Sequence, residues 1–262
     1  MPSYYAHELF GAEVMERLPS DCAEMVTNGF DGWKNGLFGP DPLMLHPKTN
    51  KYARLLHRLT TADAISRLAA SFQNGDNEAA GFAAGLLCHH ALDSACHPGV
   101  LSMANTKFNH AAIEAEFDQY LLRGRGYGRL SRALISVPRS PSVFASASKA
   151  WPGITPGLYK LSFAAFRKSM DFLSRASGTP LSRAYNAVTG RIKPLQPLHG
   201  ALAAKLPVAE LTPACQRLER VMTDNIDGTV ILITGVLRLM QTRDFFQLLP
   251  KTNFYGAKVG DA

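Results

Sequence analysis

An apolar stretch that runs directly into a row of metal-binding side chains constrains this chain more than any other feature. Residues 79–87 are almost wholly apolar, so a helix formed there is expected to be buried. The pattern continues through Cys-His-His-Ala-Leu-Asp-Ser-Ala-Cys-His, in which His89, Asp93 and His97 stand at every fourth position. On a helix these residues lie one turn apart along a single face. Because buried imidazoles and carboxylates need partners, this face predicts a polar site inside the protein.

A second pair with the same spacing follows His97. His110 and Glu114 stand at i and i+4 of another predicted helix, and Pro98 is expected to end the first helix so that His97 can turn inward. One such pair alone is more often a solvated or satisfied helix face, but two successive helices favour a shared metal site. Five imidazole and carboxylate ligands exceed what one catalytic zinc requires. A two-metal cluster is therefore predicted, with zinc, manganese or iron all compatible with nitrogen and oxygen ligands.

Helical periodicity dominates the rest of the chain, and strand patterns are scarce. Apolar residues recur at spacings of three and four in residues 6–18, 52–72, 78–95, 111–122, 157–176, 213–222 and 230–249. We expect an all-α protein of roughly seven to nine helices, in one domain over residues 1–262. The best apolar run, residues 228–237, is about half as long as a membrane span. A cytoplasmic location is expected, because no signal peptide is seen and the four cysteines suggest free thiols.

The net charge of +7 hides an uneven distribution. Residues 123–205 hold fourteen Lys and Arg but one acid, Asp171, whereas the first 122 residues hold eight Lys and Arg and fourteen Asp and Glu. The basic segment, rich in Gly and Pro, is expected to be a less regular part of the domain or a helical insertion. Its cations could contact an anionic membrane, hold a nucleic-acid backbone or only face solvent. Of the first two, the membrane is favoured over nucleic acid.

The order of these residues resembles that of the zinc-dependent phospholipase C family, whose superfamily also includes fungal single-strand nucleases. The matching elements are Met-Pro-Ser-Tyr-Tyr-Ala-His7, Gly39-Pro40-Asp41, His57 in Leu-Leu-His-Arg, His89-x3-Asp93-x3-His97-Pro98, His110-x3-Glu114 and Asp118. The resemblance covers the chain from its first residue to Asp118, and little of the C-terminal half takes part in it. It implies a multi-helix phospholipase C-like bundle around a cluster of two or three metal ions.

The resemblance also implies which residues hold which ion. One zinc would be held by Asp41, His57, His89 and Asp93. A second would be held by His97, His110 and Glu114. A third would use His7, Asp93 and the terminal residue of the mature chain. Two zinc ions are expected, and the third depends on whether a terminal residue such as Pro2 can take that place.

A chemistry follows from the same resemblance. Water activated at zinc would hydrolyse a phosphodiester bond, and the substrate is expected to be a phosphoester such as a phospholipid. Asp41, in Gly-Pro-Asp-Pro, is the candidate to orient or deprotonate that water, although Asp is also common in such turns. Asp118 is expected to hydrogen-bond a ligating imidazole or to face solvent, and His90 to pack in the core or support the ligands.

Three alternatives remain at this stage. The first is a nuclease or nucleotidase on the same scaffold. The second is a non-catalytic helical protein that keeps metal for stability and binds a membrane or a partner. The third is a His-Asp domain phosphohydrolase, suggested by the adjacent His89 and His90, but the chain contains no His-Asp dipeptide.

Overall fold

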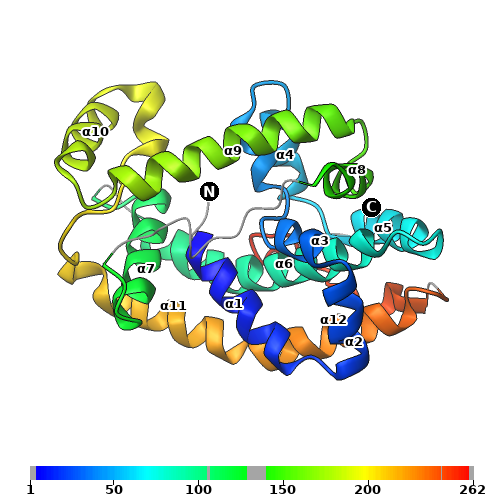
Figure 1. The fold of residues 1–262 in the computed structure, drawn as a ribbon. Coiled ribbons are helices and arrows are strands. Elements are labelled where there is room, and N and C mark those ends of the chain that lie inside the picture. The colour runs from blue at the N-terminus through cyan, green and yellow to red at the C-terminus, as the bar shows by residue number, and fades with distance from the viewer. Residues whose placement is uncertain (1–3, 105–106, 129–139, 243, 260–262) are drawn as a thin grey trace.

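The computed structural model describes residues 4–104, 107–128, 140–242 and 244–259, and these are almost entirely helical (Figure 1). The first helices are α1 (Tyr4–Arg17), α2 (Ser20–Asn28), α3 (Phe30–Gly36), the 3-10 helix η1 (Asp41–Leu45), α4 (Asn50–Leu56), α5 (Ala62–Gln73), α6 (Asn77–Met103) and α7 (His110–Gly124). They are followed by α8 (Pro141–Lys149), α9 (Pro156–Ala176), α10 (Pro180–Arg191), η3 (Lys193–Leu198), η4 (Ala209–Leu211), α11 (Thr212–Asp224), α12 (Ile226–Leu239) and η5 (Asp244–Leu248). The predicted all-α class is confirmed, with more helices than expected.

Helix α6 lies at the centre of the fold and is buried along most of its length. It contacts α1, α2, α3, α5, α8, α11 and α12. Every residue from 79 to 87 is buried, as the apolar stretch predicts. Its N-terminus is capped by the Asp76 side chain, which accepts a hydrogen bond from the backbone N–H of Ala79. The row of metal-binding residues His89, Asp93 and His97 therefore lies on a helix that is packed on several sides.

Pro98 does not end α6, contrary to the prediction, because the helix continues to Met103. A proline has no N–H to donate to the carbonyl four residues earlier, which here belongs to Ser94. Gly256 packs against this place, and a Cβ built on it would lie 2.5 Å from the Ser94 oxygen. His97 thus faces inward through its position on the helix face, without a turn of the chain.

Glycines let α3 and α6 pack backbone against backbone. A Cβ on Gly32 would overlap the carbonyl oxygen of Glu78, and one on Gly81 would overlap the carbonyl oxygen of Gly29. Only glycine permits such close approach. Since α3 leads directly into the loop that carries Asp41, this packing fixes the distance between that loop and α6.

Gly81→Ala is expected to lower the free energy of unfolding by about 1–3 kcal/mol, because the added methyl group meets rigid backbone. The matched control is Gly228→Ala in α12, where a Cβ meets nothing within 4 Å. That change should stabilise the protein by up to about 1 kcal/mol through helix propensity. Denaturant titration of both variants makes the comparison, and wild-type stability of Gly81→Ala would contradict the backbone packing.

The segment 52–72, predicted as one helix, is divided into two. Helix α4 ends at Leu56, His57 forms its C-cap, and α5 begins at Ala62. The break releases His57 from a regular helix face and brings its ring toward α6, where it lies 6.5 Å from the His89 ring.

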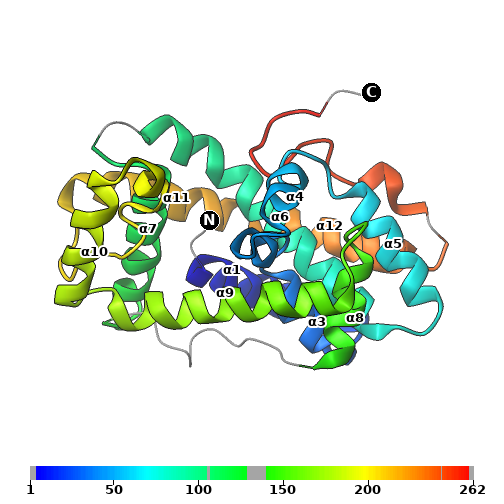
Figure 2. The same ribbon diagram turned by 90° about the horizontal axis from the view of Figure 1, so that it is seen from above.

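The described part of the basic segment is mainly helical and joins the core. Helix α9 runs along the molecule beside α8, with α10 beyond its C-terminal end (Figures 1 and 2). The Tyr159 hydroxyl donates to Asn35 Oδ1 at 2.7 Å, and the Phe166 ring lies 5.0 Å from that of Phe38. Residues 129–139 of this segment lie outside the described residues.

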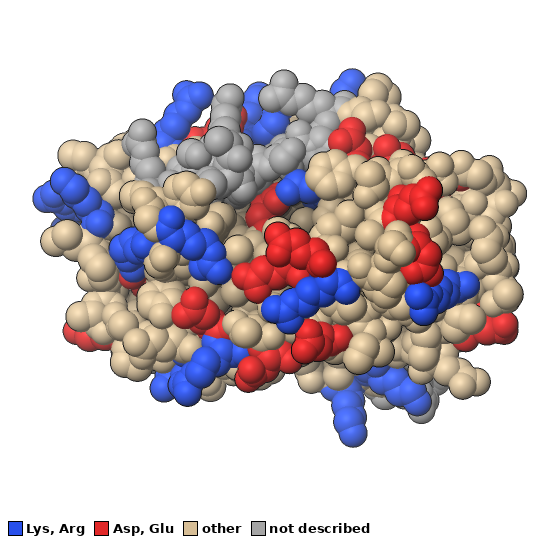
Figure 3. Space-filling model, turned by 60° about the horizontal axis from the view of Figure 1, so that its bottom comes forward, with Lys and Arg blue, Asp and Glu red and all other residues tan. Residues whose placement is uncertain are grey.

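Acidic and basic side chains are intermixed over the face shown in Figure 3. Ion pairs of this kind join the N-terminal helices to α12: Arg17 Nη1 lies 2.8 Å from Asp227 Oδ1, and Arg238 Nε lies 2.8 Å from Asp21 Oδ2.

Among the described residues, no helix combines the length and apolar character that crossing a membrane requires.

Candidate metal centre

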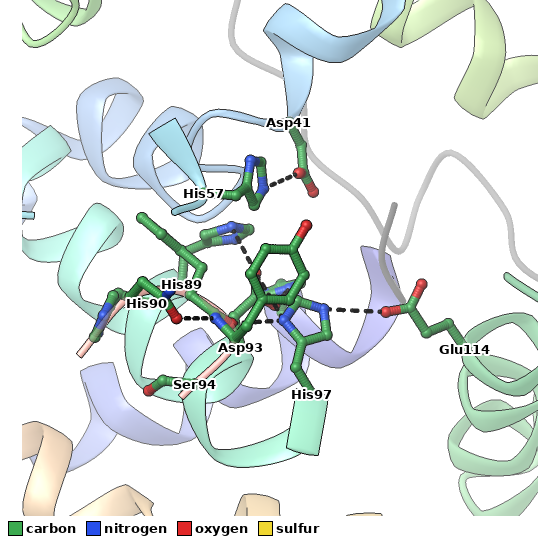
Figure 4. Close-up of polar contacts among 12 residues, drawn as sticks. Asp41, His57, His89, His90, Asp93, Ser94, His97 and Glu114 are labelled. Carbon is green, nitrogen blue, oxygen red and sulfur yellow. Dashed lines mark hydrogen bonds and ion pairs between the residues drawn. The ribbon is translucent and has the colours of Figure 1, made fainter. Parts of the chain in front are cut away.

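Five segments bring all eight predicted ligands together along α6. Figure 4 labels Asp41, His57, His89, Asp93, His97 and Glu114 among them. They are His7 from α1, Asp41 from η1, His57 from the end of α4, His89, Asp93 and His97 from α6, and His110 and Glu114 from α7. Seven of these side chains are at most 7% exposed, and His110 is 27% exposed at the rim. Residues more than 100 positions apart in the chain therefore form one buried polar cluster.

The ligand atoms fall into three groups in which all atoms lie within 4.8 Å of one another. The groups are His7 with His89 and Asp93, Asp41 with His57 and His89, and His97 with His110 and Glu114. The third is the set that the resemblance implied for the second zinc. In the other two, His89 is shared, and Asp93 is grouped with His7 and His89 instead of with Asp41 and His57. The terminal residue implied as a further ligand lies outside the described residues.

The spacing of the donor atoms suits a small divalent cation. His57 Nε2 lies 3.0 Å from Asp41 Oδ1, His7 Nε2 lies 3.2 Å from Asp93 Oδ1, and His97 Nε2 lies 3.4 Å from Glu114 Oε1. Two ligands at tetrahedral angles around zinc, with bonds near 2.0–2.1 Å, are about 3.3 Å apart. The pairs are thus separated as ligands of one ion would be.

Three imidazoles are oriented by backbone carbonyl groups on their outer side. The acceptors are the oxygens of Ala53 for His57 Nδ1 at 2.8 Å, Leu37 for His89 Nδ1 at 3.0 Å and Phe254 for His97 Nδ1 at 2.6 Å. Donation from Nδ1–H places the Nε2 lone pair of the neutral ring toward the cluster, which is how ligating histidines are held.

The inner side of the cluster needs positive charge. With Nδ1 protonated, the neutral His57 and His89 rings would direct Nε2 lone pairs at carboxylate oxygens, and such contacts need a proton or a metal ion between them. Two buried atoms, Asp41 Oδ2 and His89 Nε2, make no hydrogen bond. The donor set and these unpartnered atoms fit zinc.

The titration of the cluster follows from the same crowding of charge. Burial lowers the pKa of His97, but the charge of Asp93 and the hydrogen bond to Glu114 outweigh it and raise that pKa to about 9. Burial raises the pKa of Glu114, yet hydrogen bonds to His110 and His97 help to lower it to about 2. Without metal, a proton on His97 therefore takes the place of the missing positive charge.

Zinc affinity should consequently rise with pH up to about 9, the pKa of His97. A metal ion must displace the proton from His97, so each unit of pH below this value should weaken binding by up to about tenfold. Chelator competition at several pH values measures the slope, and calorimetry in buffers of different ionisation enthalpy counts the released protons. An affinity independent of pH would contradict the assignment of His97 as a ligand.

The Asp41 loop is shaped around His89. Gly39 has φ +50°, and a Cβ there would lie 2.4–2.9 Å from the imidazole of His89, so the turn approaches that ring as only glycine allows. Leu37, two residues earlier, supplies the carbonyl that orients the same ring. The Gly-Pro-Asp sequence therefore does more than form a turn, because it also places Asp41 beside His89.

Asp118 and His90 lie outside the three ligand groups, and His90 is buried against the C-terminal turn. Asp118 accepts hydrogen bonds from the backbone N–H groups of Tyr5, at 3.1 Å, and Ala6, at 2.9 Å, and so fixes the start of α1 instead of bonding a ligating imidazole. Burial, the largest effect, raises the pKa of Asp118 to about 7, although these backbone bonds lower it. His90 points away from the ligand groups, and its Nε2 bonds the carbonyl oxygen of Thr252 at 2.9 Å.

Residues 252–258 complete the site and were not found from the sequence. Their turn is closed by the Thr252–Lys258 bridge, and Phe254 donates its N–H to the His57 oxygen at 3.2 Å while its own oxygen orients His97. The Tyr255 ring lies 5.3 Å from that of His97. These contacts are mostly made by backbone atoms, and the only local signal was the turn-forming pair Asn253 and Gly256.

Removal of residues 252–262 is expected to weaken zinc binding by about 10- to 100-fold, the usual cost of losing the groups that orient a ligand. Tyr255→Phe is the matched control, because it leaves the backbone contacts of Phe254 in place and should bind zinc like the wild type. Chelator titration compares the variants. Unchanged affinity in the truncated chain would show that the turn does not support the ligands.

The cluster opens into a cavity of about 550 Å³. Asp41, His57, His97 and Glu114 line its floor, so a ligand bound there would reach the predicted metal positions. The remaining wall is contributed by α4, α7, the end of α9 and the residues around η3.

Comparison with known proteins gives one match. A family model described as zinc dependent phospholipase C matches residues 6–152, a stretch that contains all eight ligands and more than half of the chain. Neither a search of curated proteins nor a search of solved structures returns a match.

Proposed function

The chain belongs to the zinc-dependent phospholipase C family, and from this premise we propose that it is a phosphoesterase that hydrolyses a phosphodiester bond at the metal centre. The observation that carries the proposal is the set of imidazoles whose outer nitrogens donate to backbone carbonyls while their inner nitrogens face carboxylates. This arrangement of inward-facing nitrogen and oxygen atoms suits the binding of cations. The cluster also opens into a cavity large enough for a substrate.

We assign two zinc ions to the cluster. Asp41, His57 and His89 would hold one, and His97, His110 and Glu114 would hold the other. His7 and Asp93 offer a third place next to His89. Asp93 Oδ2 also lies 3.3 Å from His89 Nε2 and 3.9 Å from His97 Nδ1, so this carboxylate adjoins one ligand of each assigned zinc. When bound, zinc supplies Lewis acidity, which lowers the pKa of water and withdraws charge from phosphoryl oxygens.

Asp41 has the geometry of a group that orients and deprotonates water. One of its oxygens is engaged by His57, and the other, Oδ2, has no hydrogen bond. Burial raises the pKa of Asp41, but its interactions with His57 and His89 outweigh that effect and lower the pKa, so the carboxylate is ionised and can accept a proton. Asp41 also lines the cavity, within reach of a bound phosphoester.

Hydrolysis of a generic phosphodiester, bis(p-nitrophenyl) phosphate, tests the proposal. We expect turnover that a chelator abolishes and added zinc restores. Turnover that persists without metal would contradict the metal mechanism. A zinc-loaded protein that hydrolyses no phosphodiester would point to the non-catalytic alternative.

We also propose that α10 contacts an anionic membrane. The exposed surface of α10 and of its C-cap residue carries Leu181, Val188 and Ile192, each 45–51% exposed, interleaved with the exposed Arg183 and Arg191. Apolar residues that insert among head groups and cations that attract anionic lipid are typical of helices that lie on membranes. We expect the protein to sediment with phosphatidylglycerol vesicles but not with phosphatidylcholine vesicles. Equal binding to both would contradict the proposed attraction between the α10 cations and anionic lipid.

A further inference from the structure

Two guanidinium groups line the wall of the cavity. Arg54, in α4, and Arg58, one turn later, both line the cavity, on either side of His57. Both are exposed, and among the described residues no ion pair joins either side chain to a carboxylate. Arg67 of α5 shows the contrast, because its Nε lies 3.0 Å from Asp63 Oδ2.

The acids of the cavity are already engaged. Asp41, Asp93 and Glu114 belong to the metal groups, and Asp118 holds the backbone of α1. Two zinc ions would more than balance the three carboxylates of the metal groups, so the charges of the two arginines remain available to a ligand. A phosphodiester carries one negative charge, and the arginines therefore suit a substrate with a second anionic group, which guanidinium can bind through paired hydrogen bonds.

The cavity also has an apolar side. Met44, Leu45, Leu173 and Leu198 line it together with the arginines and the metal ligands. Leu198 is 43% exposed, so this apolar surface reaches the opening of the cavity. A ligand that covers both sides is amphiphilic, with an anionic end and a hydrocarbon portion.

We propose that Arg54 and Arg58 select a phospholipid whose head group carries a second anionic group, in preference to one without it. The inference rests on the proposed function, since the same site would cleave the lipid. A water oxygen would form the new bond to phosphorus, the bond from phosphorus to the glycerol oxygen would break, and that oxygen would take up a proton. The products are diacylglycerol and a phosphorylated head group with two anionic groups.

Two soluble short-chain lipids that differ by one carboxylate provide the test: dihexanoyl phosphatidylserine and dihexanoyl phosphatidylethanolamine. The wild type should prefer the serine lipid by about 10- to 100-fold in kcat/KM, the range for one or two charge-assisted contacts. Arg54→Ala with Arg58→Ala should lower kcat/KM for the serine lipid, mainly through KM, until it matches that for the ethanolamine lipid. Arg67→Ala is the matched control and should behave like the wild type.

Calorimetric binding of both lipids to the zinc-loaded protein separates this inference from the proposed function. Tighter binding of the serine lipid, lost in the double variant, supports the arginine site even if no lipid is cleaved. Cleavage of both lipids at equal rates, with equal affinity, overturns the inference and leaves the proposed function standing. An effect of the double variant on vesicles alone would also overturn it, because the arginines would then contact a membrane surface and not the substrate.

Discussion

Asp93→Ala is expected to abolish most zinc binding and nearly all hydrolysis. The Asp93 carboxylate lies between three of the predicted histidine ligands. Its Oδ1 lies 3.2 Å from His7 Nε2, and its Oδ2 lies 3.3 Å from His89 Nε2 and 3.9 Å from His97 Nδ1. It is 5% exposed, so water cannot readily take its place. Activity should fall by at least about 10³-fold, the upper range for removal of one preorganised electrostatic group.

The measurement combines bound zinc per chain with the rate on bis(p-nitrophenyl) phosphate. Asp63→Ala is the control, because Asp63 forms only an exposed ion pair with Arg67 and such pairs contribute little stability. Circular dichroism must show the helical content of the wild type in both variants. A folded Asp93→Ala protein that keeps its zinc and its rate would contradict the shared role of this carboxylate.

Asp41→Asn is expected to lower kcat by about 10²- to 10⁴-fold, the usual contribution of a general base, with KM little changed. The amide preserves the shape of the side chain but cannot accept a proton from water. Because His97, His110 and Glu114 form a separate group, at least that group should keep its metal. Zinc content measured beside kcat therefore separates the loss of a proton acceptor at Asp41 from the loss of the zinc ion that Asp41 helps to hold.

A profile of kcat against pH gives the second readout for Asp41. In the wild type the acid limb should report the ionisation of the base, and in Asp41→Asn this limb should flatten. A kcat within threefold of the wild type, with the same profile, would assign the water-orienting role to another group. Asp41→Glu, which restores the carboxylate at a different reach, should recover part of the rate.

The spacing of side chains along helices was enough to predict the centre of the site. His89, Asp93 and His97 share a face because α6 is a continuous helix, and the apolar residues before them required that helix to be buried. The pair His110 and Glu114 was found by the same rule. These features depend on local periodicity, which the sequence contains directly.

The outer support of the ligands could not be predicted, because it consists largely of backbone atoms. The carbonyls of Leu37 and Phe254 orient two of the imidazoles, and any residue type offers a carbonyl. Their positions depend on how α3 approaches α6 and on how the C-terminal turn folds over Ser94. The role of Asp118 is a similar case, because its partners are the N–H groups at the start of α1.

The expectation for Pro98 was wrong for a reason that is also tertiary. A proline usually ends or bends a helix, but α6 is packed on several sides and Gly256 covers the weakened place. In the basic segment, too, tertiary packing decides the structure against the local sequence pattern. Its Gly and Pro content indicated irregular structure, whereas aromatic residues of α9 pack against Phe38 beside the site.

Metal content of the purified protein, measured by atomic emission after dialysis against zinc-free buffer, tests the central claim most directly. We expect about two or three zinc ions per chain, released by a chelator together with the loss of phosphodiester hydrolysis. Less than one zinc ion per chain, in protein that is folded and active, would contradict it.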